Sequence, residues 1–570
     1  MDDRLGRIES ALQGILPLLN SLTAPSQLLS LQPQPQSTNL GSSLGDDMMT
    51  HGRHGRSPTP AGPLQTLFPP AHTLLFAADV YFRFCHNQPY SLFHEASLRQ
   101  RLASGQIPAH LAWAVLAAAR RFSTLPDLSE SISNDPMSLV RLSWGCLKLP
   151  WDGAKSDEEA VQVIQTIVLL VNIEHPAGHC ASAFMKLGFA LRVALHSRLH
   201  MEPEAELSTI FKEERKRTFW SVYLQDKLIS LSRERSPVLR DELCRIRLAC
   251  SEAAFREGRE EDCPTLDCFI GERLDESAVE KCCPLALIAV MSSALNRASQ
   301  YALHENRYSE LGVPWSPSSP YTSSSASLLQ LEVHFGLSEP AAEMMKRNCF
   351  TNQAADQHIT GSFIYAKALF HLAHCLLHHP FLLHQRLQRL KQRAPMSFAK
   401  TAWEVCRTHA KALTGLKDMR SHNVLILPSL YGYCMMIAGT IHALSLGDDK
   451  PSIKDEASLH FKYAIEFLHD LSRYWGHAAL MATRLERFRQ TVEGHRFLTD
   501  GRTPLIGQPN VDFMWQSVDY ILLSTPTRPG SPRIEEDTGG FDFDFSPSQL
   551  FDFDGLTSLT SLNQPSELHS

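Results

Sequence analysis

The sequence predicts an all-α protein whose main part is a large multi-helix domain. Long segments with apolar residues at helical spacing recur from residue 71 to about residue 500, whereas alternating Val- and Ile-rich runs bounded by turn dipeptides are scarce. No period of 34 or 40 residues recurs clearly, which argues against a helical solenoid. A chain of 570 residues is long enough for several domains and more than one hydrophobic core.

The first 22 residues are expected to form a short, coiled-coil-like helix. Apolar residues there follow the alternating three- and four-residue spacing of a coiled-coil seam: Leu5, Ile8, Leu12, Ile15 and Leu19. The seam lasts only two heptads, so an isolated helix of this length would be marginal. Two alternatives stay open: the helix packs on the body, or it is a dimerisation helix of a homo- or heterodimer.

Residues 23–70 have the composition of a disordered linker, since they are rich in Ser, Pro, Gln and Gly and poor in large apolar residues. The stretch at residues 41–45 matches G-x-S-x-G. A nucleophile elbow needs a strand before this motif and a helix after it, and neither is predicted here.

The helical domain is predicted to span residues 71–500. Its clearest helical segments are 110–122, 158–174, 184–200, 215–232, 282–303, 363–379, 429–446 and 460–475. No apolar run reaches the 18 residues of a membrane span, so a membrane partner is not expected. The 13 cysteines are odd in number and scattered through apolar contexts, which favours reduced, buried thiols.

A cluster of histidines within residues 370–384 raises the question of a metal site. His371, His374, Cys375 and His378 fall on one face of a helix, and imidazole and thiolate are ligands that zinc or copper prefers. Every gap between them is filled by an apolar residue, however, and no carboxylate lies nearby in sequence. We therefore expect a packed helix here, with no metal and no other cofactor in this chain.

Residues 212–248 begin with a mixed charge cluster, KEERKR, in which Glu213 and Glu214 favour a solvated helix start. Aromatic residues follow at helical spacing, and Asp226 lies one or two turns before Arg233 and Arg235. Buried Asp–Arg pairs that close the following loop are the interpretation we prefer.

This stretch resembles the fungal-specific transcription factor domain, the regulatory middle region of fungal zinc-cluster regulators. The residues that carry the resemblance are Arg217, Phe219, Trp220, Asp226, Arg235, Pro237 and Asp241. Three further landmarks agree in order: LFH at 92–94, GFALRVA at 188–194 and LLHHPF at 376–381. The sequence departs from the family pattern at Lys227, where Arg is usual, and at 235–237, where Gly-Arg-Pro is usual.

The resemblance implies a nuclear regulator of RNA polymerase II transcription rather than an enzyme. Regulators of this family read DNA through a cluster of six cysteines and two zinc ions. The first cysteine here is Cys85, and no cysteines have that spacing. We therefore expect zinc only if an N-terminal cluster lies outside this sequence, and contact with DNA only through such a missing module or a partner.

Residues 501–570 are predicted to be a mostly disordered tail. From residue 531 onward there are eight acidic residues and one basic residue, which accounts for the whole net charge of −7. Aromatic and acidic residues alternate within 535–556, a composition typical of disordered activation segments. The predicted coactivator anchors are Phe541, Phe543, Phe545, Leu550, Phe551, Phe553 and Leu556. An edge strand, or a clamp on the body, is the alternative, but Pro547 interrupts the alternation.

Two other functions stay open from the sequence. The chain could be an interaction-only partner or co-regulator of a complete zinc-cluster protein, pairing through residues 5–19. It could also be a helical small-molecule-binding protein or an enzyme, but no nucleophile–base pair, metal triad or phosphate loop is evident.

Overall fold

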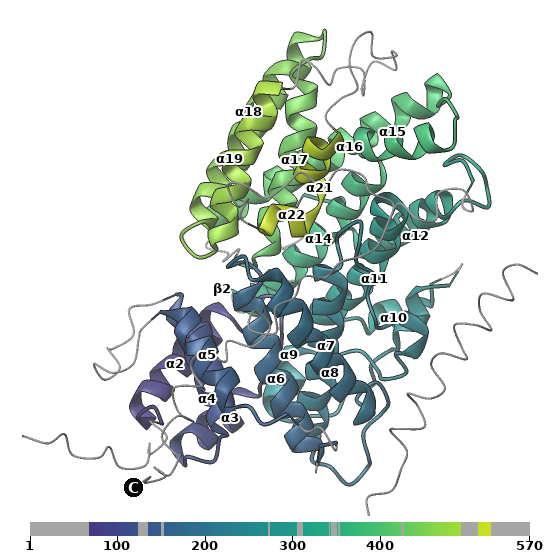
Figure 1. The fold of residues 1–570 in the computed structure, drawn as a ribbon. Coiled ribbons are helices and arrows are strands. Elements are labelled where there is room, and N and C mark those ends of the chain that lie inside the picture. The colour runs from purple at the N-terminus through teal and green to yellow at the C-terminus, as the bar shows by residue number, and fades with distance from the viewer. Residues whose placement is uncertain are drawn as a thin grey trace, which may run out of the picture. The chain divides into compact units, whose positions relative to one another are not determined.

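The computed structural model consists almost entirely of α-helices, which confirms the predicted all-α fold (Figure 1). All the residues that the structure describes belong to one compact unit. The structure describes residues 68–122, 135–149, 153–154, 156–271, 274–304, 312–340, 343, 350–351, 354–422, 427–491 and 511–525. The predicted helix at 1–22, nearly all of the predicted linker at 23–70 and the predicted activation segment at 535–556 lie outside these residues.

The first group of helices contains the buried α8, on which most of the motif residues lie. Its members are α2 (Ala71–Phe84), α3 (Glu95–Ala103), α4 (Ala109–Arg120), α5 (Pro136–Cys146), α6 (Asp157–Glu174), α7 (Cys180–His196) and α8 (Thr209–Ile229). The start of α6 shows why these segments are helical: the Ser156 hydroxyl accepts a hydrogen bond from the Glu159 amide. Three acidic residues in the first turn also stabilise the helix, because their negative charges lie near the positive end of the helix dipole.

A middle group combines short helices with two long ones. It comprises η1 (Asp241–Leu243), α9 (Glu252–Glu257), η2 (Leu266–Phe269), α10 (Glu276–Glu280), α11 (Pro284–Leu303) and α12 (Pro320–Phe335). Two-residue strands β1 (Phe350–Thr351) and β2 (Ala354–Ala355) form an antiparallel pair before α14. Gly336 ends α12 in the left-handed conformation, which glycine adopts without strain.

The remaining helices surround α14 and α17, which are buried almost all round. They are α14 (Gln357–Leu377), α15 (Pro380–Arg389), α16 (Met396–Gly415), η3 (Leu416–His422), α17 (Leu430–Ser445), α18 (Pro451–Leu471), α19 (Gly476–Thr491), α21 (Val511–Val518) and α22 (Tyr520–Ser524). Every residue of α17 is buried, because α14, α16, α18 and α19 all pack against it.

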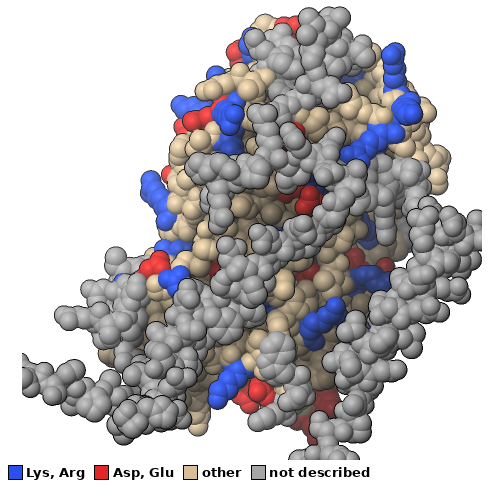
Figure 2. Space-filling model, in the orientation of Figure 1, with Lys and Arg blue, Asp and Glu red and all other residues tan. Residues whose placement is uncertain are grey.

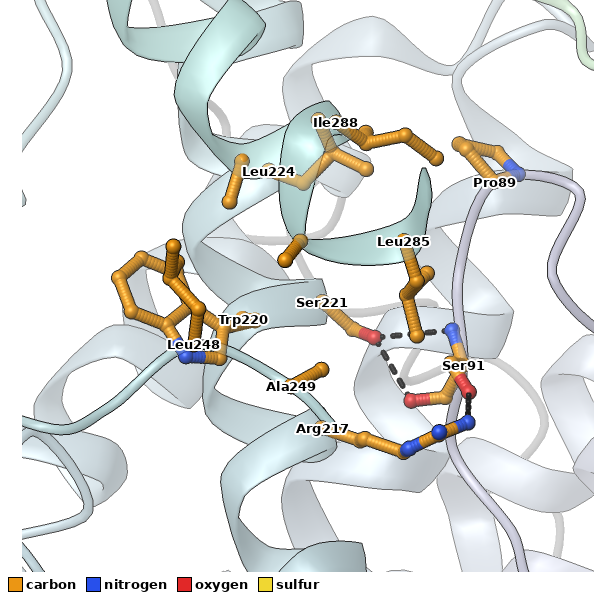
Figure 3. Close-up of a pocket in the computed structure, with 12 residues that line it drawn as sticks. Pro89, Ser91, Arg217, Trp220, Ser221, Leu224, Leu248, Ala249, Leu285 and Ile288 are labelled. Atoms are coloured by element: carbon orange, nitrogen blue, oxygen red, sulfur yellow. Dashed lines mark hydrogen bonds between the residues drawn. The ribbon is translucent and has the colours of Figure 1, made fainter. Parts of the chain in front are cut away.

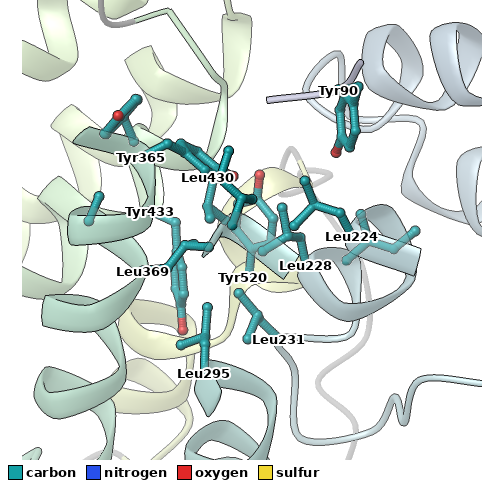
Figure 4. Packing of buried hydrophobic residues seen from close by; sticks show 14 of the residues in the cluster. Tyr90, Leu224, Leu228, Leu231, Leu295, Tyr365, Leu369, Leu430, Tyr433 and Tyr520 are labelled. Carbon is teal, nitrogen blue, oxygen red and sulfur yellow. The ribbon is translucent and has the colours of Figure 1, made fainter. Parts of the chain in front are cut away.

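One continuous hydrophobic core extends from α2 to α22. Its centre brings together residues far apart in sequence, among them Tyr90, Leu228, Tyr365, Leu430 and Tyr520 (Figure 4). Among the described residues, no helix has both the length and the apolar character needed to cross a bilayer.

Candidate regulatory site

Helix α8 passes through the interior of the protein, so its charged residues must find partners. Glu213 and Glu214 are only 5% and 4% exposed. The predicted solvated helix start is therefore wrong. The spacing of Glu213 and Arg217, four residues apart, was the sequence signal for an ion pair on one helix face.

The Arg217 guanidinium is almost fully buried and donates hydrogen bonds in several directions. Nε donates to Glu213 Oε1 at 3.1 Å, and Nη1 donates to Glu252 Oε2 and to Ser91 Oγ, both at 2.8 Å. Nη2 donates to the Cys250 carbonyl at 3.1 Å. Arginine suits this position because its planar fork can serve several acceptors at once. These bonds join α8 to α9 and to the segment before α3.

Glu252 is the second centre of this network. It accepts hydrogen bonds from His86 at 3.1 Å and from Asn87 at 3.0 Å, in addition to that from Arg217. Burial alone would raise the pKa of Glu252, but these hydrogen bonds and the Arg217 charge hold it well below the ordinary value. A buried carboxylate, that of Glu213, and a partly buried one, that of Glu252, thus lie around one buried guanidinium.

Asp226, at the other end of α8, closes the following loop, but not through arginine side chains as we expected. Its carboxylate accepts hydrogen bonds from the backbone amides of Val238 at 3.2 Å and Leu239 at 2.8 Å. Lys227 pairs instead with Asp241, at 2.9 Å. Burial raises the pKa of Asp226 to about 6, although the two amide hydrogen bonds act in the opposite direction.

The other motif residues hold neighbouring elements in place. The Trp220 indole donates to the Arg247 carbonyl at 2.8 Å, and Phe219 is completely buried beside it. The Arg235 guanidinium lies 4.1 Å from the centroid of the Phe184 ring, so it contacts α7 and not Asp226. Pro237 is half-buried in the loop that Asp226 closes.

A pocket lies between α8 and α11, lined by Arg217, Trp220 and Ser221 on one side and by Leu285 and Ile288 on the other (Figure 3). Its cavity volume is about 20 Å³, which is room for roughly one water molecule. This cavity therefore does not accommodate a ligand larger than a water molecule.

The histidines of α14 lie close together, but they do not form a ligand set. His371 Nδ1 is 2.8 Å from Nδ1 of His409 on α16, and the His374 ring stacks on His409 at a centroid distance of 3.9 Å. His378 Nδ1 bonds the His374 carbonyl oxygen, and the Cys375 thiol points to the Cys406 carbonyl. In the described parts of the chain, no three His, Cys, Asp or Glu side chains are placed to hold a metal ion.

Burial determines the titration of these histidines. It lowers the pKa of His409 to about 3 and that of His378 to about 4, and it places those of His371 and His374 well below the ordinary value. All four imidazoles are therefore neutral at pH 7.

Residues 511–525, which we call the strap, connect the body to the acidic tail. Trp515 is 1% exposed, and its ring packs on Phe381 of α15 at a centroid distance of 5.3 Å. Asp519 Oδ2 accepts hydrogen bonds from the Ser232 hydroxyl at 2.9 Å and from the Arg233 amide at 3.0 Å. The strap is thus fixed to the loop after α8.

Tyr520 of the strap inserts its side chain into the centre of the core (Figure 4). Its ring lies 5.0 Å from that of His175 and 4.9 Å from that of Tyr433. The adjoining cavity of about 20 Å³ is lined by His175 and Tyr365 among other residues, and both have a buried polar atom, His175 Nε2 and the Tyr365 hydroxyl. Neither atom has a hydrogen-bond partner among the described residues.

Two sets of predicted site residues lie outside the described residues. They are the dimerisation residues Leu5, Ile8, Leu12, Ile15 and Leu19, and the activation-segment residues Phe541, Phe543, Phe545, Leu550, Phe551, Phe553 and Leu556. Residues that the sequence analysis did not single out, but that the structure places at the site, are His86, Ser91, Glu252 and Asp519.

Comparison with known proteins identifies the region that holds this site. A family model described as the fungal specific transcription factor domain matches residues 78–347. The Zn(2)-C6 fungal-type transcription factor FTF1c of Fusarium oxysporum f. sp. lycopersici is 24% identical over 432 residues, which cover 70% of this chain and 43% of that protein. The match therefore spans less than half of this relative's length.

Two further relatives match shorter regions. An uncharacterized transcriptional regulatory protein of Schizosaccharomyces pombe is 28% identical over 28% of this chain and 17% of its own length. The citrinin biosynthesis transcriptional activator mrl3 of Monascus ruber is 26% identical over 27% of this chain and 31% of its own length. No solved structure matches the chain significantly. The family model and these relatives are all described as transcription factors or transcriptional regulators.

Proposed function

Since the chain contains a fungal specific transcription factor domain at residues 78–347, we propose that it regulates transcription by RNA polymerase II in the nucleus. The helical body is the regulatory part and the acidic-aromatic tail is the activation segment. The match to this domain carries the proposal, and the names of the relatives, all transcriptional regulators, support it.

The proposed mechanism is recruitment of a coactivator by the tail. The seven aromatic and leucine anchors within 541–556 would enter an apolar groove of the coactivator, while the aspartates keep the rings in water until then. The strap supports a role for the body, because it fixes the start of the tail to the loop after α8.

Contact with DNA is proposed to be made by a zinc cluster or a partner protein outside residues 1–570. No two cysteines of the chain have the C-x-x-C or C-x6-C spacing of such a cluster. A dimer through residues 5–19 would place two such readers at a fixed spacing on DNA.

A reporter assay tests the activation segment directly. We expect residues 531–570, fused to an unrelated DNA-binding module, to activate a reporter well above the module alone. The matched control replaces the five phenylalanines by alanine and keeps every acidic residue, so that net charge is unchanged. Background activity of the unaltered fusion, or full activity of the alanine variant, would contradict the proposed role of the aromatic anchors.

A further inference from the structure

A cavity much larger than the pocket in Figure 3 lies beside the first half of α8. Its volume is about 230 Å³, which is room for one small organic molecule. The residues that line it come from three segments of the chain, 202–203, 209–216 and 247–261. Four of these eleven residues are basic and four are acidic, so we call it the charged cavity.

Lys216 is the most buried of the basic residues in the charged cavity. Its side chain is 11% exposed, against 23% for Lys212 and about half for the two arginines. The Lys216 ammonium lies 2.8 Å from Glu213 Oε2. Burial lowers the pKa of Lys216, but the Glu213 charge more than offsets this and holds it above the ordinary value. The cavity therefore contains a charged ammonium group that is largely withdrawn from water.

The less exposed carboxylates of the cavity are already occupied by donors of the protein. Besides its ion pair with the lysine, Glu213 accepts hydrogen bonds from Arg217 Nε at 3.1 Å and from the Cys250 amide at 2.9 Å. Glu261 accepts from the Ser251 amide at 2.9 Å and from the Ser251 hydroxyl at 2.8 Å. These carboxylates leave little capacity for the ammonium group of a ligand.

The lysines, by contrast, have more N–H groups than acceptors. Lys212 and Lys216 lie one turn apart on α8, and both line the cavity. Each ammonium group has three donors. In the described part of the chain, Lys216 has only Glu213 as an acceptor, and Lys212 has only Glu260, at 3.5 Å. Several N–H groups are therefore available to a ligand.

We propose that the charged cavity binds a small oxyanion, through a phosphate or carboxylate group held by Lys212 and Lys216. Charge-assisted hydrogen bonds from ammonium groups to such oxygens are stronger than those between neutral groups. Thr209, one turn before Lys212 at the start of α8, adds a hydroxyl to the lining, and this end of the helix dipole favours negative charge. Arg247 and Arg259 would contact a second acidic group of the ligand.

A small molecule suits this cavity better than a nucleic acid does. Glu202 and Glu260, which also line it, are 48% and 70% exposed, so they would repel the phosphate backbone of DNA. Basic and acidic side chains are both spread over the face of the molecule in Figure 2. The attraction for an anion is therefore local to the two lysines.

A bound anion would also affect the buried network around Arg217. Lys216 and Arg217 pair with different oxygens of Glu213, at 2.8 Å and 3.1 Å. An anion beside Lys216 competes with Glu213 for the ammonium group, so binding would be coupled to the contacts that join α8 to α9. Such binding does not depend on the proposed role in transcription.

Isothermal titration calorimetry of the full chain tests the site. The probes are inorganic phosphate and citrate, each titrated at constant ionic strength so that general screening of charges is the same. We expect at least one of them to bind one-to-one with a Kd below about 1 mM. Tighter binding of phosphate would identify a phosphate as the ligand group, and tighter binding of citrate a carboxylate.

Two lysine variants locate the site. Lys212→Gln and Lys216→Gln should each raise the Kd about tenfold or more, because each removes a charge-assisted hydrogen bond to the anion. The matched control, Lys462→Gln, removes an exposed lysine of α18 that also has a glutamate beside it, and should leave the Kd unchanged. Circular dichroism checks that each variant is folded. Lys212 is the more exposed of the two, so its variant keeps the test decisive if Lys216→Gln unfolds.

Three results would overturn the proposal. Neither probe could bind with a Kd below about 1 mM. A probe could bind equally well to Lys212→Gln and to the wild type, which would place its site elsewhere. A short DNA duplex could bind the full chain at physiological salt and lose its binding in Lys212→Gln, which would assign the lysine to a nucleic-acid surface. The reporter assay is independent, because a silent fusion leaves anion binding by the body in place.

Discussion

Arg217 illustrates how single residues stabilise the centre of this protein. A buried guanidinium is tolerated because all three of its nitrogens donate hydrogen bonds. The acceptors are Glu213, Glu252, Ser91 and the Cys250 carbonyl. Burial lowers the pKa of Arg217, but the charges of Glu252 and Glu213 more than offset this and hold it above the ordinary value. The network therefore stays ionised across the physiological pH range.

The buried histidines, unlike the ionised Arg217 network, must be neutral in the folded protein, because burial disfavours the charged imidazole. Since burial places the pKa of His374 in the folded protein well below its unfolded value of about 6.5, the unfolded chain binds more protons at acid pH. The titration of His374 does not affect stability above about pH 6.5. Below about pH 6.5 it destabilises the folded protein, and the effect grows as the pH falls.

Replacing His374 should make the protein more tolerant of acid. Neither ring nitrogen has a hydrogen-bond partner in the described part of the chain, so His374→Leu costs no hydrogen bond. Between about pH 7.5 and about pH 5.5 we expect the variant to lose about 1.4 kcal/mol less free energy of unfolding than the wild type. Urea denaturation at the two pH values measures this difference.

The control for this measurement is His469→Gln, which removes an exposed imidazole from α18 and should keep the wild-type pH profile. An unchanged pH profile for His374→Leu would show that His374 is not a neutral buried base.

Helices α17 and α19 show how close packing limits the choice of residue within an element. Gly439 lies in the buried α17, and a Cβ atom added there would overlap with the side chain of Leu485 on α19. Leu485 is itself completely buried, so it has little room to move aside. Gly188 of α7 is also within a helix, but a Cβ atom added there meets nothing within 4 Å.

Alanine at these two glycines should have opposite effects on stability. Gly439→Ala is expected to destabilise the protein by about 1–3 kcal/mol through overpacking. Gly188→Ala should stabilise it by about 0.5–1 kcal/mol, because alanine loses less backbone entropy in a helix. Thermal unfolding of both variants measures the difference. A stabilising effect of Gly439→Ala would contradict the close approach of α17 and α19.

At the scale of the whole molecule, the strap joins parts of the chain that are far apart in sequence. Asp519 reaches the loop after α8, while the Tyr433 hydroxyl of α17 donates to the Val518 carbonyl at 2.7 Å. Arg484 of α19 donates to the Thr525 carbonyl at 3.0 Å. Release of one short segment would therefore alter contacts with both the first and the last groups of helices.

Asp519→Ala should detach the strap. The substitution removes the cap of α22, in which Asp519 Oδ1 accepts from the Ile521 and Leu522 amides, and leaves the Arg233 amide without its acceptor. We expect a loss of about 2–4 kcal/mol in stability, since a lost cap costs about 1 kcal/mol and a buried unpaired donor about 1–3 kcal/mol. Faster hydrogen exchange in 511–525 should accompany it.

Asp512→Ala is the matched control, because Asp512 lies on the exposed face of the same strap and should leave exchange unchanged. Equal exchange in the two variants would mean that Asp519 does not hold the strap.

Much of the fold could be predicted because the spacing of apolar residues within one short segment is enough to indicate a helix. The segment predicted at 158–174 corresponds to α6, and that predicted at 363–379 lies almost wholly in α14. The partners of charged residues could not be predicted in the same way. Glu213 was expected in solvent and is buried, since its burial depends on Cys250 and other residues that are distant in sequence.

The sequence alone determined the helical class, the resemblance to a fungal regulatory domain and the concentration of negative charge after residue 530. Each of these features can be recognised from the types of neighbouring residues and their spacing along the chain. Only the tertiary structure decided that Arg217 and Glu252 pair and that Asp519 fixes the strap. Those features depend on side chains from distant segments meeting in space, and long-range packing decides such contacts.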